Sequence, residues 1–176
     1  MQTYIGFLRG INVSGQKKIK MADLKISLEK IGFLNVHTYI QSGNIVFSSS
    51  ESSIQMLQEK IQSCIKKKFG FDVPVMLVTK GVIKNILHNY PFKNAEEKNK
   101  YFVLLYTKPQ AALQIDFELL EFKNEEFQVK ENCIYLNCKI GAGKAKLNTN
   151  LIERKLKVIA TTRNLKTMQK MLELAD

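Results

Sequence analysis

The sequence has few of the residues that form disulfides or bind metals. Its three cysteines, Cys64, Cys133 and Cys138, are an odd number in a chain without a secretion signal, so they do not make a disulfide framework. The spacing of Cys133 and Cys138 puts them on opposite faces of a strand, which argues against a shared metal. The two histidines, His37 and His88, have no carboxylate or cysteine at ligand spacing. We therefore expect reduced thiols, no metal and no cofactor.

Long hydrophobic runs are also absent. The longest, such as residues 102–106, are far too short to span a bilayer, and residues 1–4 lead into a strand without the regions of a signal peptide. We therefore predict a cytoplasmic protein that does not enter a membrane; its oligomeric state stays open. With 176 residues, 45% of them hydrophobic, the chain can bury the core of one domain or of two small ones.

Acidic residues are scarce beside basic ones. There are 16 Asp and Glu against 27 Lys and Arg, which leaves a net charge of +11. The excess is uneven, because residues 93–138 carry six basic and eight acidic groups, whereas residues 139–170 carry nine basic groups and the single acid Glu153. Such a basic segment attracts phosphate. The alternative is a solvated surface in a lysine-rich proteome, which the use of only three arginines suggests.

The first 80 residues alternate between strand and helix patterns. Strands are predicted at residues 3–9, 36–41, 44–48 and 73–79, and two amphipathic helices end at Gly32 and Gly70, the second beginning at a capping box on Ser52. The order βαββαβ is the ferredoxin-like plan. Because Pro74 cannot donate a hydrogen bond to a neighbouring strand, we expect the fourth strand at a sheet edge.

The second half follows a looser pattern. Helices are predicted at residues 81–89, 109–120, 148–157 and 164–175, and strands at 100–107, 126–131 and 133–138, with a short strand at 158–162 as an option. The predicted fold class is therefore α+β, a ferredoxin-like subdomain of residues 1–80 followed by a second, smaller α+β subdomain of residues 81–176 with basic C-terminal helices.

The ferredoxin-like order should bring two polar loops together. Its first and second strands run parallel with the third between them, so the loop after the first strand and the hairpin between the next two leave the sheet at one end. The residues expected to form one polar site there are Arg9, Asn12, Gln41, Ser42 and Asn44. Gly43 supplies the positive φ that a two-residue hairpin turn at Ser42-Gly43 needs. A helix that begins near Met21 would add unpaired N–H groups at the same end.

A glycine-rich stretch at residues 139–145 precedes further candidates. It suits anion binding by the backbone and Lys144, but it is not a nucleotide-binding P-loop, because Cys138 stands where the first glycine is needed and Ala145 where a magnesium-binding hydroxyl is needed. Further cationic and hydrogen-bonding candidates are Lys146, Thr161, Thr162, Arg163 and Asn164. Arg163 at the start of the last helix would oppose the helix dipole, which suggests another use. The alternative is that asparagines and glycines fix turns and that Arg163-Asn164 caps the helix.

Three separated motifs, at residues 9–15, 38–47 and 161–164, resemble those of a widespread bacterial family, the domain of unknown function 1697 family. The resemblance spans nearly the whole chain and implies that the polar candidates above, Lys144 excepted, belong to recurrent motifs of the family. The chain departs at Ser14, where glycine is common, at Ala145, where a serine precedes a Lys-Leu pair, and at Leu165, where a tryptophan usually follows Arg-Asn. The resemblance implies no established activity.

Three classes of function fit these observations. The first is binding of an anionic ligand, with nucleic acid as its most concrete form, through the basic segment and the polar loops. The second is an enzyme that acts on a small phosphorylated or carboxylated molecule, with Arg9 and Arg163 as anion clamps and no obvious nucleophile. The third is a structural or interaction protein whose motifs hold two subdomains together. We favour anion binding.

Overall fold

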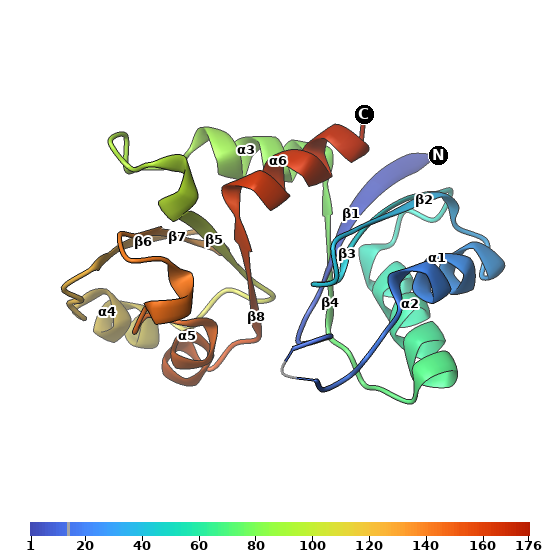
Figure 1. The fold of residues 1–176 in the computed structure, drawn as a ribbon, viewed down its shortest axis with the longest axis horizontal. Coiled ribbons are helices and arrows are strands. Elements are labelled where there is room, and N and C mark those ends of the chain that lie inside the picture. Colours follow the sequence, from blue (N-terminus) through green and yellow to red (C-terminus); the bar gives the residue numbers. More distant parts are fainter. Residues whose placement is uncertain (14) are drawn as a thin grey trace. The chain divides into compact units, whose positions relative to one another are not determined.

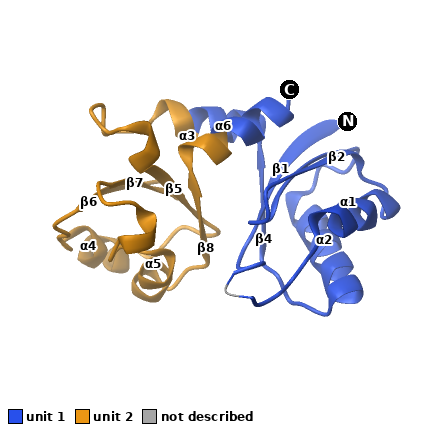
Figure 2. Cartoon of the chain, viewed as in Figure 1, with its two compact units in different colours: residues 1–85, 169–176 blue, residues 86–168 orange. Residues whose placement is uncertain are grey.

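The chain forms two compact α+β units. A computed structural model describes residues 1–13 and 15–176, which form one unit of residues 1–85 and 169–176 (unit 1) and another of residues 86–168 (unit 2) (Figure 2). Each unit contains one four-stranded antiparallel sheet, which confirms the predicted α+β class. The expected halves, 1–80 and 81–176, assign the last eight residues to the second half, whereas in the structure they belong to unit 1.

Unit 1 is built around a sheet in the order β2-β3-β1-β4. Its elements are β1 (Gln2–Leu8), α1 (Met21–Lys30), β2 (Leu34–Tyr39), β3 (Asn44–Ser49), α2 (Ile54–Phe69), β4 (Val75–Thr79) and most of α3 (Lys80–His88), whose last three residues belong to unit 2. As predicted, β3 lies between β1 and β2, and β4 is an edge strand. Pro74, which pointed to that edge, lies just before the strand itself.

One face of the unit 1 sheet is covered by α1 and α2, which lie side by side (Figure 1). The apolar core between helices and sheet includes Leu24 and Leu28 of α1, Leu57 and Ile61 of α2, and Phe47 of β3, each at most 1% exposed. Side chains three or four residues apart share a face of a helix, so Leu24 and Leu28 lie on one side of α1, and Leu57 and Ile61 on one side of α2.

Two local predictions in unit 1 were wrong. The N-cap of α2 is Ser53, whose Oγ accepts a hydrogen bond from the Met56 N–H at 3.3 Å, and not Ser52. The β2–β3 hairpin has a four-residue turn, residues 40–43, because Tyr39 pairs directly with Asn44. Ile40 takes a φ of +46°, which a β-branched residue rarely adopts, so the longer turn could not be predicted from the residue types.

Unit 2 repeats the strand order of unit 1 as β6-β7-β5-β8. Its elements are a short 3₁₀ helix η1 (Glu97–Asn99), β5 (Lys100–Leu105), α4 (Ala111–Glu118), β6 (Glu125–Lys130), β7 (Cys133–Cys138), a second 3₁₀ helix η2 (Ala142–Lys144), α5 (Thr149–Leu156) and β8 (Ala160–Asn164), and α6 (Leu165–Leu174) is divided between the units. The optional strand at 158–162 is thus a full edge strand, shifted by two residues.

The two faces of the unit 2 sheet bury different side chains. One face packs with α4 and α5 through a core that includes Val103, Ile134 and Ile152. Tyr90 lies with its ring centroid 5.5 Å from that of Phe102 of β5, and Tyr90 Oη donates a hydrogen bond to the Leu136 carbonyl at 2.9 Å. Burial raises the pKa of Tyr90 well above its usual range.

Candidate functional site

The loop after β1 and the β2–β3 turn meet at one end of the unit 1 sheet, as the strand order predicted. Phe7 is paired with Asn44, and the Leu8 N–H donates to the Gly43 carbonyl at 2.8 Å. The next residue, Arg9, donates its backbone N–H to the Pro74 carbonyl at 3.0 Å. The backbone therefore fixes where the candidate polar side chains of both loops start.

Asn12 ties the two loops together. Its Nδ2 donates to the Ile19 carbonyl at 2.9 Å and to the Gln41 carbonyl at 2.8 Å, and its Oδ1 accepts from the Ile19 N–H at 2.8 Å. Its φ of +54° lies in the left-handed region, where asparagine is enriched among residues other than glycine. These three bonds use both amide donors and one acceptor site on backbone groups, so they favour a role for Asn12 in holding the loops.

Asn44 has a similar role in the hairpin turn. The side chain is fully buried, and its Nδ2 donates to the Tyr39 carbonyl at 2.9 Å and to Ser42 Oγ at 3.0 Å. Both contacts lie within the turn that Asn44 closes. The amide of Asn44 thus stabilises the turn, because a buried amide without partners would cost free energy.

Gly43 is required in this turn for two reasons. Its φ is +78°, as the hairpin prediction expected, and a Cβ built there would lie 2.6 Å from Leu8 Cβ and 2.9 Å from Ile11 Cδ1. The turn therefore packs directly on the end of β1 and on the loop that follows it.

Cationic and polar side chains lie on the loop after β1, on the β2–β3 turn and beside them. Arg9 and Ser42 are half-buried and Gln41 is exposed. Lys17 Nζ donates to the Asp72 carbonyl at 2.6 Å, and Lys20 occupies the N-cap of α1 without a side-chain hydrogen bond to the helix. Ser14, a departure from the family pattern, lies outside the described residues.

The second group of candidates lies on β8. Arg163 is 7% exposed, and its Nη1 donates to Thr161 Oγ1 and to the Thr162 carbonyl, both at 2.8 Å. The hydroxyls of Thr162 and Thr149 are 2.6 Å apart. This arrangement is a local network on a buried part of unit 2.

The expected position of Arg163 at the start of the last helix was wrong. Arg163 is a strand residue, paired with Phe102 of β5, because β8 extends as far as Asn164. Asn164 does cap α6, since its Oδ1 accepts from the Thr167 N–H at 2.9 Å, which confirms the capping interpretation for that residue. The argument that the charge of Arg163 opposes a helix dipole is therefore not needed.

Lys144 and Lys146 lie apart from β8, in η2 and in the loop before α5, and both side chains are exposed. The Lys146 N–H donates to Glu125 Oε1 at 2.9 Å, and Glu125 is only 6% exposed. A buried carboxylate thus fixes the loop that carries Lys146.

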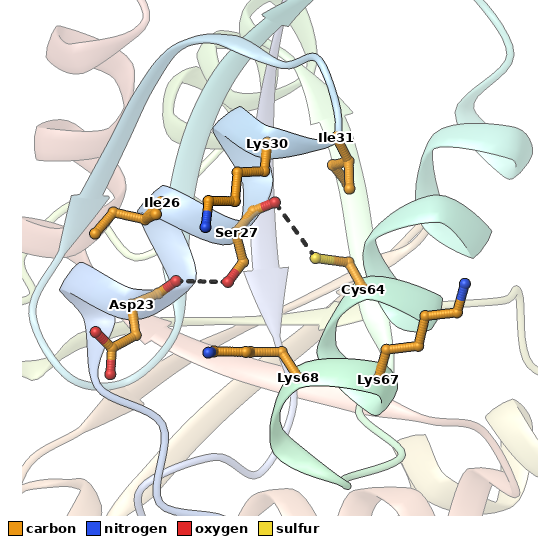
Figure 3. Close-up of a pocket in the computed structure, with 8 residues that line it drawn as sticks. All are labelled: Asp23, Ile26, Ser27, Lys30, Ile31, Cys64, Lys67 and Lys68. Carbon is orange, nitrogen blue, oxygen red and sulfur yellow. Dashed lines mark hydrogen bonds between the residues drawn. The ribbon is translucent and has the colours of Figure 1, made fainter.

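The candidates therefore fall into three places: the loop cluster of unit 1, the β8 network of unit 2, and the loop between β7 and α5. Sequence reasoning missed a pocket between α1 and α2, lined by lysines from both helices and by Cys64 (Figure 3). The sequence gives no distinct signal for this pocket, because its lysines and Cys64 also fit the ordinary pattern of an amphipathic helix. No group of three or more potential metal-ligand side chains occurs among the described residues, and no described helix is long and apolar enough to cross a membrane.

Comparisons with known proteins place the whole chain in a structural context. A solved structure described as a conserved bacterial protein, SP0830 from Streptococcus pneumoniae, matches with a TM-score of 0.74 and 26% identity over 99% of this chain and 98% of that one. A search of curated proteins gave no match. The family model described as a protein of unknown function (DUF1697) matches residues 1–135, which include all of β1 to β6. The chain therefore belongs to the DUF1697 family.

Proposed function

We propose that the protein binds a polyanion, with nucleic acid as the main candidate, through exposed basic residues of unit 2. The single observation that carries this proposal is a run of exposed cations that make no ion pair with any described residue: Lys144, Lys146, Arg154, Lys155 and Lys157. We call these five residues the basic surface. In the same segment, Lys139 differs because it pairs with Glu126 at 3.3 Å.

Unpaired cations on neighbouring elements suit the charge density of nucleic acid. The helix α5 is about 12 Å long, and duplex DNA carries one negative charge per ~1.7 Å of its axis, so several phosphates would pass along a surface of this length. Glu153 of α5 is the single acid in residues 139–170, and its Oε1 accepts a hydrogen bond from the Ala160 N–H at 2.9 Å. One carboxylate against five cations leaves the basic surface positive.

Helix stability accounts for only part of the basic surface. Arg154 and Lys155 lie in the last turn of α5, where positive charge interacts favourably with the helix dipole. Lys144 and Lys146 precede the N-cap of α5, so the dipole of α5 does not favour a cation at either position. The fixed loop at Lys146 also lowers the cost of ordering its side chain on binding. Lys144 and Lys146 are therefore the residues that separate a binding role from a stabilising one.

The test measures how the affinity for an oligonucleotide depends on salt, in the native protein and in the double variant Lys144→Gln/Lys146→Gln. The control is Lys98→Gln/Lys130→Gln, which removes the same charge from exposed residues of unit 2 that have partners, Glu96 and Asn89. The native protein should lose affinity steeply with added salt. If both lysines contact phosphate, the first variant should bind more weakly and its log–log slope should be flatter by about two units, whereas the control should bind nearly as the native protein does.

Two results would contradict the proposal. One is absence of oligonucleotide binding by the native protein even at low salt. The other is an equal loss in both double variants, which would mean that net charge alone matters and that the basic surface has no special position.

A further inference from the structure

The pocket between α1 and α2 of unit 1 has the size of a small-molecule site. Its volume is about 490 Å³, within the range of roughly 300–1,000 Å³ that is typical of ligand pockets. Figure 3 shows the contact between Ser27 of α1 and Cys64 of α2 in the middle of the pocket, with Lys30 of α1 on one side of it and Lys68 of α2 on the other. Ile26 and Lys67, which also line the pocket, lie at its two outer sides.

The polar groups in the middle of the pocket already have partners. Ser27 Oγ donates to the Asp23 carbonyl at 2.7 Å, and Cys64 Sγ donates to the Ser27 carbonyl at 3.5 Å (Figure 3). Burial raises the pKa of the Cys64 thiol, with the charge of Lys67 partly opposing this, so the thiol is neutral near pH 7. Ile26, 49% exposed, adds apolar surface. The centre of the pocket therefore offers contact to an apolar group.

The rim of the pocket is positive. Lys30, Lys67 and Lys68 contribute three positive charges against the single negative charge of Asp23, and none of the three lysines makes an ion pair with a described residue.

Neighbouring lysines on the same two helices differ in this respect. Lys25 pairs with Glu29 at 3.8 Å, Lys66 pairs with Asp72 at 2.8 Å, and neither lysine lines the pocket. The helix dipole favours cations in the last turn of each helix, but it does so equally for the paired Lys66. The pocket thus gathers unpaired cations around an apolar centre.

We propose that the α1–α2 pocket binds a small organic anion, a monocarboxylate with an apolar body, whose carboxylate lies among Lys30, Lys67 and Lys68 and whose apolar part packs on Ile26 and the Cys64 side chain. Charge complementarity selects the anionic head, and the neutral, hydrogen-bonded centre selects an apolar rather than a polar body. The site lies in unit 1 and does not depend on the basic surface of unit 2.

Cys64 provides a direct test, because it is half-buried while Cys133 and Cys138 are buried. The rate at which iodoacetamide alkylates Cys64 can be followed by peptide mass spectrometry with and without decanoate. Near-saturating decanoate should slow the reaction at least fivefold, and decanol at the same concentration should slow it less than twofold. Alkylation of the two buried cysteines reports any unfolding by the additive in the same samples.

Two double variants separate the pocket from general surface charge. Lys67→Gln/Lys68→Gln should abolish the protection by decanoate, while Lys25→Gln/Lys66→Gln, with the same loss of charge from paired lysines of the same helices, should retain it. Melting temperatures close to that of the native protein establish that each variant is folded. No protection of native Cys64 by decanoate, equal protection by decanol, or equal loss in both double variants would overturn the proposal.

Discussion

The two units share one strand order and differ in the residues placed on it. At the same point of each sheet, a leucine near the end of the central strand donates its N–H to the turn before the neighbouring strand: Leu8 to Gly43 in unit 1 and Leu105 to Asn132 in unit 2, both at 2.8 Å. The backbone frame is therefore repeated, although no sequence repeat is visible. Only the turn of unit 1 requires a glycine, Gly43, at this position.

The edge strands β4 and β8 differ more in their side chains than the two turns do. Leu8 pairs with Val75 and Leu105 with Ala160, so residues 76–78 of β4 correspond to residues 161–163 of β8. The first set reads Met-Leu-Val and the second Thr-Thr-Arg. Hydrogen bonding between strands does not depend on side chains, so the same sheet can carry an apolar edge in one unit and a polar network in the other.

The largest effect should come from breaking the turn that only unit 1 requires. Gly43→Ala should destabilise the protein by roughly 2–4 kcal/mol, because it adds positive-φ strain to a close contact with Leu8 Cβ. Asn132→Ala at the matching place in unit 2 should cost less than about 1 kcal/mol, since Asn132 has no positive φ. Urea unfolding of both variants measures the difference, and equal losses would mean that the two turns have equivalent roles.

The polar network of β8 should be stabilising in its own right. Arg163→Gln should cost about 1–3 kcal/mol, because Thr161 and the Thr162 carbonyl lose a buried donor. Lys166→Gln, an exposed change nearby, serves as the control and should be nearly neutral. Thermal melts with and without phosphate and RNA provide the measurement. Unchanged or raised stability of Arg163→Gln, together with loss of stabilisation by phosphate or RNA, would instead favour an anion clamp.

The smallest effect should be a difference in pH dependence at the ends of β3 and β7. Burial, with Glu125 adding to it, raises the pKa of Cys138 to about 11, whereas the matching residue in unit 1 is Ser49, which does not titrate there. In the unfolded chain the Cys138 thiol loses its proton near pH 9, whereas the folded protein keeps that proton up to a pH of about 11. The contribution of this thiol to the free energy of unfolding is therefore complete below pH 9 and is lost as the pH rises through about 11.

Cys138→Ala should therefore flatten the loss of stability between pH 9 and pH 11, measured by urea unfolding, and Ser49→Ala should leave that slope unchanged. Differences between variant and native protein remove the titration of lysines and tyrosines from the comparison. An unaltered slope in Cys138→Ala would show that the thiol does not contribute.

Much of the fold followed from local patterns in the sequence. The strand Cys133–Cys138 was predicted with its observed bounds, because apolar residues continue along it between two turns. Gly70 ends α2 in the left-handed conformation, as glycine at that place predicts. Ser52 was predicted as the N-cap of α2 in place of Ser53 because the two serines have the same chemistry. The residue at which α2 begins depends on how the helix packs.

The candidate site was predictable where it depended on topology and not where it depended on side-chain partners. The strand order brought Arg9 and Asn44 to the same end of the sheet. The strand order does not predict that the Asn12 amide donates hydrogen bonds to backbone carbonyls, or that Arg163 donates one to Thr161. The α1–α2 pocket was missed for a similar reason, since the exposure of Cys64 depends on how two helices pack.

The division of α6 between the units bears on how the protein is made. Residues 169–176 belong to unit 1, where Asp176 forms an ion pair with Lys80, although the chain passes through all of unit 2 before reaching them. During synthesis on the ribosome, which proceeds at about 5–20 residues per second, unit 2 can therefore be complete while unit 1 still lacks its last segment. Unit 1 begins emerging from the ribosome first and is finished last.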